Sequence, residues 1–215
     1  MGRIAHVPDN PFGEVPALPV AFVVGVTAFV VELLLLLRGG RSTWPRAIVA
    51  AALAVYAAGI FANTVLPIHL NRPPQLQPWT PKLALIPFYD YEVMDAITNA
   101  IVFAPLGILI PLLMRRPSWV KVVLTAAAVS LAIELLQIVT DGLFGGGHVA
   151  DVNDLLWNTV GGAVGYAIFL VVSRAPGLSR LVELFRWHPA TRSTLSSSQA
   201  QVSESDRLPR PSERR

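Results

Sequence analysis

The sequence contains no cysteine and few charged residues. The absence of cysteine excludes disulfide bonds, thiolate chemistry and zinc sites built from cysteine. Only 14% of the 215 residues are charged, whereas soluble domains usually carry about a quarter. Hydrophobic residues make up 53% of the chain, and the mean hydropathy is +0.53. This composition argues against a soluble enzyme and indicates an integral membrane protein.

Five apolar runs have about the length of 20 residues that a helix needs to cross roughly 30 Å of hydrocarbon. None of them alternates with a period of two, as barrel strands do, so helices are the spanning form that fits. The sequence therefore predicts an all-α, polytopic transmembrane helical bundle. Its five spans are expected at residues 17–37, 47–67, 95–113, 122–140 and 155–172.

The basic residues are sorted between the connections in a way that predicts orientation. Fourteen of the 17 Lys and Arg residues lie in residues 38–46, residues 115–121 and the segment after Val172. Eight of the 14 acidic residues lie in or beside the opposite connections. Because Lys and Arg are enriched on the cytoplasmic side, we expect the N-terminus outside and the C-terminus in the cytoplasm.

The segments around the spans complete the predicted organisation. Residues 1–16 form an extracytoplasmic N-terminus, and residues 17–173 form the transmembrane domain. Within residues 174–188, apolar residues recur at helical spacing, which predicts an amphipathic helix lying at the membrane interface. Residues 189–215 are rich in Ser, Arg and Pro and are expected to be a disordered cytoplasmic tail. Anionic lipid at the inner leaflet explains the arginines of this tail, so no nucleic acid partner is expected.

Polar residues form one stripe along each of the last three spans, although ionisable groups inside a membrane are costly. The topology places the three stripes in the outer half of the membrane, where the loop that contains His148 joins the fourth and fifth spans. We therefore predict one polar pocket that opens to the exterior. Its candidate residues are Asp95, Asn99, Glu134, Gln137, His148, Asp151, Asp154 and Asn158.

Simpler explanations remain open for several of these residues. Asp95 and Asp151 lie at span ends, where water can solvate them, and either Asp151 or Asn153 could be the N-cap of the fifth helix. Glycines at 161 and 165 are typical of close helix packing. Glu134 and Gln137 do not lie at a span end, so they are the stronger candidates for a pocket.

Four sequence motifs carry a family resemblance. They are Leu-Ile-Pro-Phe at 85–88, Asn-Ala-Ile-Val-Phe-Ala-Pro-Leu-Gly at 99–107, Glu-Leu-Leu-Gln at 134–137 and Asp-Val-Asn-Asp-Leu-Leu-Trp-Asn-Thr-Val-Gly at 151–161. In this order and spacing the chain resembles the VanZ-like family over residues 48–169. The resemblance implies a multi-pass protein of the bacterial plasma membrane, and the name-giving member is associated with low-level resistance to the glycopeptide teicoplanin.

The chain departs from that family pattern in one respect. Family members often have Arg where this chain has Gly147 or His148. His148 could pair with a carboxylate or a phosphate in that Arg's place only when it is protonated.

The residues leave two classes of function open, so the chain is not assigned as an enzyme or a non-enzyme. In the first, the pocket binds or acts on a lipid-linked cell-envelope precursor, with Glu134, Asp151 and Asp154 as catalytic candidates. The same three carboxylates could hold a divalent cation. In the second, the protein is not an enzyme and binds an antibiotic such as a glycopeptide, a lipid or a protein partner. The lipid bilayer is a partner in both cases.

Overall fold

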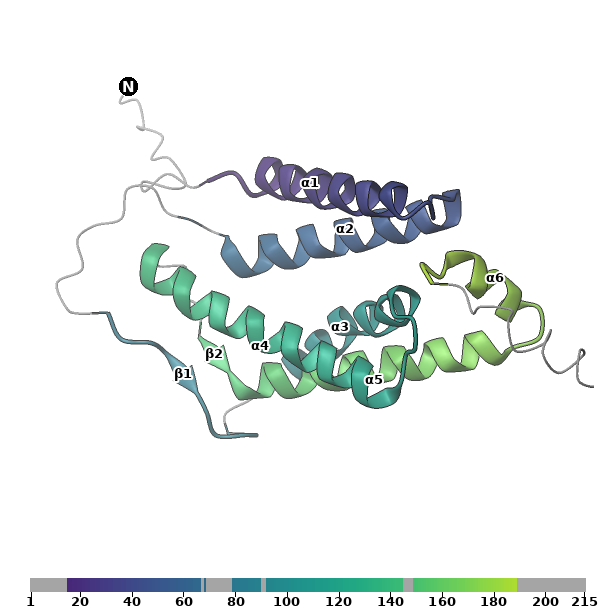
Figure 1. Cartoon of the computed structure of the whole chain (residues 1–215). Helices are drawn as coiled ribbons and strands as arrows, with labels where there is room; N and C mark the ends of the chain where they lie inside the picture. The colour runs from purple at the N-terminus through teal and green to yellow at the C-terminus, as the bar shows by residue number, and fades with distance from the viewer. Residues whose placement is uncertain (1–14, 67, 69–78, 90–91, 145–148, 189–215) are drawn as a thin grey trace, which may run out of the picture.

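Five long helices account for most of the part of the chain that the structure describes (Figure 1). This structure is a computed structural model, and it describes residues 15–66, 68, 79–89, 92–144 and 149–188. Each long helix is long and apolar enough to cross a membrane, which confirms the predicted five-span bundle. The helices are α1 (Ala17–Arg38), α2 (Trp44–Val65), α3 (Val93–Leu113), α4 (Trp119–Phe144) and α5 (Val152–Arg174).

Helix α5 is the centre of the bundle and packs closely against both α3 and α4. Its glycines permit the approach to α3, because a Cβ atom on Gly161 would overlap the Ala100 carbonyl and one on Gly165 would overlap the Ala104 carbonyl. Buried side chains of α2 to α5, including Phe103, form the apolar core. The glycines at 161 and 165 therefore have the packing role that their spacing indicates.

Helix α1 is peripheral and packs mainly against α2. In Figure 1 the two helices lie side by side as a layer above the other three. Leu36 is the buried residue of α1, and most of its other large side chains are exposed. An apolar surface of this kind is what lipid-facing helices present.

Helix α6 (Leu178–Phe185) follows α5 and has two different faces. Val182 and Phe185 pack against the core, whereas Leu178, Leu181 and Leu184 are exposed. A helix therefore lies within residues 174–188, where an amphipathic helix is predicted. The predicted tail at 189–215 lies outside the described residues.

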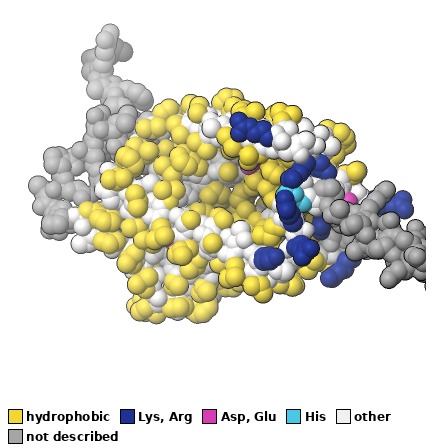
Figure 2. All heavy atoms as spheres, in the orientation of Figure 1, with side chains coloured by type: hydrophobic (Ala, Val, Ile, Leu, Met, Phe, Trp, Pro, Cys, Tyr) yellow, Lys and Arg dark blue, Asp and Glu magenta, His cyan; other side chains and the backbone are white. Residues whose placement is uncertain are grey.

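Charged side chains divide between the two ends of the bundle. Figure 2 shows the Lys and Arg side chains gathered around the α6 end, while hydrophobic side chains cover most of the visible face. The acids Glu92, Asp95, Asp151 and Asp154 lie at the opposite ends of α3 and α5. We call these the basic end and the acidic end. The separation agrees with the sorting seen in the sequence, although the direction in which the bundle crosses the membrane stays a prediction.

Candidate functional site

A short parallel strand pair organises the acidic end. Strand β1 (Leu83–Ala84) pairs with β2 (Ala150–Asp151), with Leu83 opposite Ala150 and Ala84 opposite Asp151. The backbone N–H of Ala150 also donates to the Lys82 carbonyl at 3.1 Å. The pairing brings the segment between α2 and α3 against the start of α5. Pairing between segments so far apart in the sequence is not visible in a local sequence pattern.

Glu134 fastens β2 to α4. Its side chain is only 6% exposed, and its Oε2 accepts a hydrogen bond from the backbone N–H of Asp151 at 3.0 Å. A buried carboxylate needs such a donor, because an unpaired polar group loses its hydration without compensation. The strongest candidate from the sequence therefore lies at the site, bonded to the backbone of another candidate.

Asp151 is the N-cap of α5, which decides between the two N-cap candidates. Its Oδ1 accepts from the Asn153 backbone N–H at 2.8 Å and from Asn153 Nδ2 at 3.0 Å. Asn153 Oδ1 in turn accepts from the backbone N–H of Phe88 at 2.8 Å. Phe88 has a φ of 61°, a strained value for a bulky residue. The cap of α5 thus also holds a strained turn of the segment that follows β1.

Two further side-chain hydrogen bonds join α5 to its neighbours. On the α3 side, Asn99 Nδ2 donates to Asp154 Oδ1 at 2.6 Å. On the α4 side, Asn158 Nδ2 donates to Ser130 Oγ at 3.0 Å, and both residues are buried. The three predicted stripes therefore meet at α5, but on two different sides of it.

An acid-lined pocket of about 200 Å³ opens on the α3 side of α5. Four carboxylates line it: Glu92, Asp95, Asp151 and Asp154. Ala96, Asn153 and Trp157 complete its wall. Asp95 is exposed, on the first turn of α3. The described hydrogen bonds use only Oδ1 of Asp151 and Oδ1 of Asp154. The pocket therefore presents negative charge and hydrogen-bond acceptors to whatever enters it.

The remaining candidates do not line this pocket. Glu134 of α4 bonds to β2, and Asn158 lies on the side of α5 that meets α4, where it bonds to Ser130. Gln137 is half-buried, and its Oε1 is a buried atom with no hydrogen-bond partner among the described residues. Asn99 reaches the pocket only through its bond to Asp154. His148 lies outside the described residues.

Sequence reasoning missed four lining residues, one of which is Ala96, next to Asp95 on α3. Glu92 precedes α3 as its N-cap residue, three positions before Asp95. Asn153 and Trp157 lie beside Asp154 on the first turns of α5. The spacing of three residues from an accepted candidate is the signal that could have found Glu92 and Trp157, because such positions share a helix face.

The predicted divalent cation has no complete set of ligands in the described part of the chain. There, no three Asp, Glu or His residues are placed so that they could hold a metal ion. Of the three predicted ligands, Asp151 and Asp154 line the pocket, whereas Glu134 does not. The described residues therefore do not fit a metal centre.

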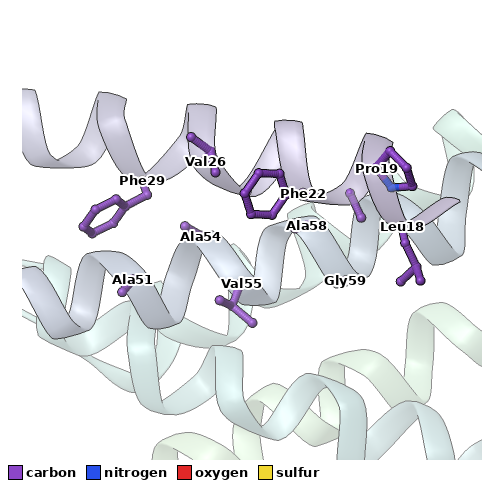
Figure 3. A pocket seen from close by; sticks show the side chains of 12 residues that line it. Leu18, Pro19, Phe22, Val26, Phe29, Ala51, Ala54, Val55, Ala58 and Gly59 are labelled. Carbon is purple, nitrogen blue, oxygen red and sulfur yellow. The ribbon is translucent and has the colours of Figure 1, made fainter.

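A second hollow is a separate feature, far less polar than the acid-lined pocket. It has a volume of about 770 Å³ and lies between α1 and α2. Figure 3 shows Phe22, Val26 and Phe29 of α1 pointing along it, with Ala54 and Val55 on α2. Its lining, as far as the chain is described, includes no ionisable side chain. It can therefore contact hydrocarbon but offers no group for chemistry.

The family relationship follows from a match that covers the acidic end and the core. The model of the VanZ/LLP1 family matches residues 53–173. The chain belongs to the VanZ-like family. The VanZ-like segment runs from within α2 to the end of α5, so it contains every residue that lines the acid-lined pocket. No curated protein and no solved structure matches the chain.

Proposed function

We propose that this VanZ-like membrane protein binds a cell-envelope ligand in the acid-lined pocket. The ligand is a lipid-linked cell-wall precursor or a glycopeptide of the teicoplanin type. The observation that carries the proposal is the gathering of Glu92, Asp95, Asp151 and Asp154 around one opening. Charged groups are scarce in this chain and costly near a membrane, so four of them at one pocket favour a binding role.

The charge of the pocket defines the part of the ligand that it receives. Four carboxylates repel a phosphate or diphosphate that comes without a neutralising cation. Ammonium, hydroxyl and amide groups instead donate hydrogen bonds to carboxylate oxygens. We therefore assign the pocket to the donor-bearing portion of the ligand, such as its peptide or sugar, and leave the lipid tail in the bilayer.

Binding fits the described residues better than catalysis. Acyl or phosphoryl transfer needs a nucleophile within reach of a base. Ser130 is fully buried and accepts from Asn158, and Glu134 Oε2 is held by the Asp151 backbone. Both groups are thereby engaged in holding α4 to α5 and β2. The proposal is therefore a binding protein rather than an enzyme.

A second candidate function is a purely structural role for the same carboxylates. It is favoured by the bonds within the chain, since Glu134, Asp151 and Asp154 each accept at least one. In that case the protein contacts a lipid or protein partner elsewhere, and the acids only specify the fold. Asp95 separates the two candidates, because it lines the pocket while no described hydrogen bond engages it.

The proposal places the pocket at the outer surface of the bacterial plasma membrane. The connections and helix ends at the basic end carry Arg41, Arg46, Arg115, Arg116 and Lys121, which favours a cytoplasmic position for that end. The acidic end then faces the exterior, where glycopeptides and the exposed form of cell-wall precursors are found.

The role in resistance is tested in cells. A teicoplanin-sensitive bacterium that produces the chain should tolerate more teicoplanin than the same strain with an empty vector. Asp95→Asn should lose most of this protection, while Glu183→Gln, at the opposite end, should keep it. Equal tolerance with the chain and with the empty vector would contradict the resistance role, and full protection by Asp95→Asn would favour the structural alternative.

A further inference from the structure

At the basic end, three separate parts of the chain are tied together. The backbone N–H of Trp187 donates to the Leu112 carbonyl at 2.9 Å, which joins the segment after α6 to α3. Arg46 Nε donates to the Arg186 carbonyl at 2.8 Å, which joins α2 to the same segment. The rings of Trp44 and Phe185 meet edge to face, 6.3 Å apart. These contacts hold the segment after α6 against α2 and α3, so the side chains at this end have defined positions.

His188 marks where the guanidinium groups converge. Arg41 Nη1 lies 3.1 Å from His188 Nδ1. A guanidinium only donates, so Nδ1 accepts and the ring is neutral, with its proton on Nε2. Burial lowers the pKa of His188, and the charges of Arg41, Arg115 and Arg46 lower it further. Arg41, from the α1–α2 connection, therefore contacts the ring, and the charges of Arg46 and Arg115 also act on it.

These arginines are not neutralised by carboxylates. Within the described part of the chain, none of Arg41, Arg46 and Arg115 forms an ion pair, and the Glu183 carboxylate lies 3.2 Å from Arg186. Arg46 uses Nε and Nη1 on the carbonyls of Arg186 and Arg41. A guanidinium carries five N–H donors, so most donors of these three groups stay available.

A hollow adjoins this cluster through Arg115. It has a volume of about 440 Å³, and its lining residues are Met114, Arg115, Arg116 and Lys121. Three of the four lining side chains are cationic, and all three are exposed. A planar guanidinium binds phosphate oxygens with two parallel hydrogen bonds, and a lysine adds a point charge. The chemistry of this hollow is therefore that of a phosphate site.

The surroundings indicate that a lipid brings the phosphate. Leu178, Leu181 and Leu184 are exposed on α6 beside the basic end, and Trp44 is 71% exposed. Leucines enter hydrocarbon and tryptophans lie at the headgroup level, so this end lies where phospholipid headgroups are. We propose that the hollow at the basic end binds the phosphate group of an anionic phospholipid, with Arg115 as its central residue beside Arg116 and Lys121.

This site is independent of the acid-lined pocket and of the function proposed for it. It lies at the other end of α3 and α5 and would exist whether or not the pocket binds an envelope ligand. A general attraction of basic residues to membranes would involve all exposed arginines alike, whereas this site depends on Arg115. An exposed arginine outside the hollow therefore serves as the matched control. Arg180 is exposed on α6 and does not line the hollow.

The test uses the purified full-length chain in neutral detergent, with binding followed by tryptophan fluorescence and thermal stability. Phosphatidylglycerol should bind and stabilise the protein, whereas phosphatidylcholine and inorganic phosphate at equal concentration should not. Arg115→Gln should weaken phosphatidylglycerol binding about fivefold, the effect of one basic residue near an anionic surface. Arg180→Gln should change it less than about twofold, as expected for a charge outside the site.

Several outcomes would overturn the proposal. They are equal losses in Arg115→Gln and Arg180→Gln, which would mean a diffuse charge effect, and equal binding of phosphatidylcholine or of phosphate alone. If Arg115→Gln does not fold with native helix content, Lys121→Gln replaces it and carries the same expectation. Unchanged binding in a folded Lys121→Gln protein would then overturn the proposal.

Discussion

The carboxylate of Glu134 accepts a hydrogen bond from the backbone N–H of Asp151, 3.0 Å away. This bond joins the middle of one apolar helix to the strand that precedes the next. It accounts for a buried acid in a span without assigning it to chemistry, because the donor is fixed by β2 and the cap of α5. The same bond also fixes Asp151, which lines the acid-lined pocket, from the α4 side.

Removing this acceptor should destabilise the acidic end. Glu134→Ala leaves the half-buried Asp151 N–H without its partner and should lower the free energy of unfolding by about 1–3 kcal/mol. Glu134→Gln keeps an acceptor oxygen and should lose less. Thermal unfolding in detergent measures both, with Glu183→Ala on α6 as the control for loss of an acid. Equal stability of Glu134→Ala and the wild type would contradict the role of this bond.

Close packing of α3 on α5 predicts a strong effect of one methyl group. Gly165→Ala should lower the free energy of unfolding by about 1–3 kcal/mol, because the new Cβ overlaps the Ala104 carbonyl. Gly59→Ala is the matched control, since nothing lies within 4 Å of its Cβ position. That variant should be neutral or slightly stabilising, as alanine favours helix. A Gly165→Ala protein as stable as Gly59→Ala would show that the two helices are further apart than described here.

The basic end should weaken at acidic pH through His188. Its pKa lies below the ordinary value of 6.5, first because of burial and then because of Arg41, Arg115 and Arg46. At a pH between the folded and the unfolded pKa of His188, the unfolded chain binds more protons than the folded chain. Protonation of this residue therefore does not reduce the stability of the fold above about pH 6.5, and it reduces that stability as the pH falls further. Between about pH 8 and about pH 5, the melting temperature of the wild type should fall more than that of His188→Gln. A difference that does not change with pH would contradict the placement of this ring.

Orientation is tested by reporter fusions. Fusions after Thr43 and after Arg116 should both report the cytoplasm, because both connections lie at the basic end. A fusion after Gly147 should report the exterior. Agreement between the first two is an internal control on insertion. An exterior signal after Arg116 would reverse the predicted orientation and place the acid-lined pocket inside the cell.

The long helices were predictable because a membrane imposes length and hydropathy on the local sequence. Helices α2, α3, α4 and α5 begin two or three residues before the predicted spans, and α4 continues four residues beyond residue 140, to Phe144. Polar and aromatic residues such as Trp119 and Asp141 lower local hydropathy without interrupting a helix. Hydropathy therefore locates the apolar centre of a span better than its ends.

The candidate site was predictable in part. Helical spacing identified Asp95, Asp151 and Asp154, and the structure places all three around one pocket. Spacing could not separate them from Glu134, because the side of α5 on which a residue meets its neighbours depends on how the helices pack. The contact of Trp79 with α4 could not be predicted either: its Nε1 donates to Asp141 Oδ2 at 3.0 Å, and the two residues are 62 positions apart in the sequence. Non-local contacts of this kind leave no periodic signal.

The most direct test of the central claim is the affinity of the purified chain for an envelope ligand, measured with and without the Asp95 charge. A lipid-linked cell-wall precursor and teicoplanin are titrated into wild type, Asp95→Asn and the control Glu183→Gln. The account predicts that at least one ligand binds, and that Asp95→Asn weakens it about tenfold, which corresponds to about 1.4 kcal/mol. Glu183→Gln should bind as the wild type does. Unchanged affinity in Asp95→Asn, or no binding of either ligand by the wild type, would contradict the assignment of the pocket.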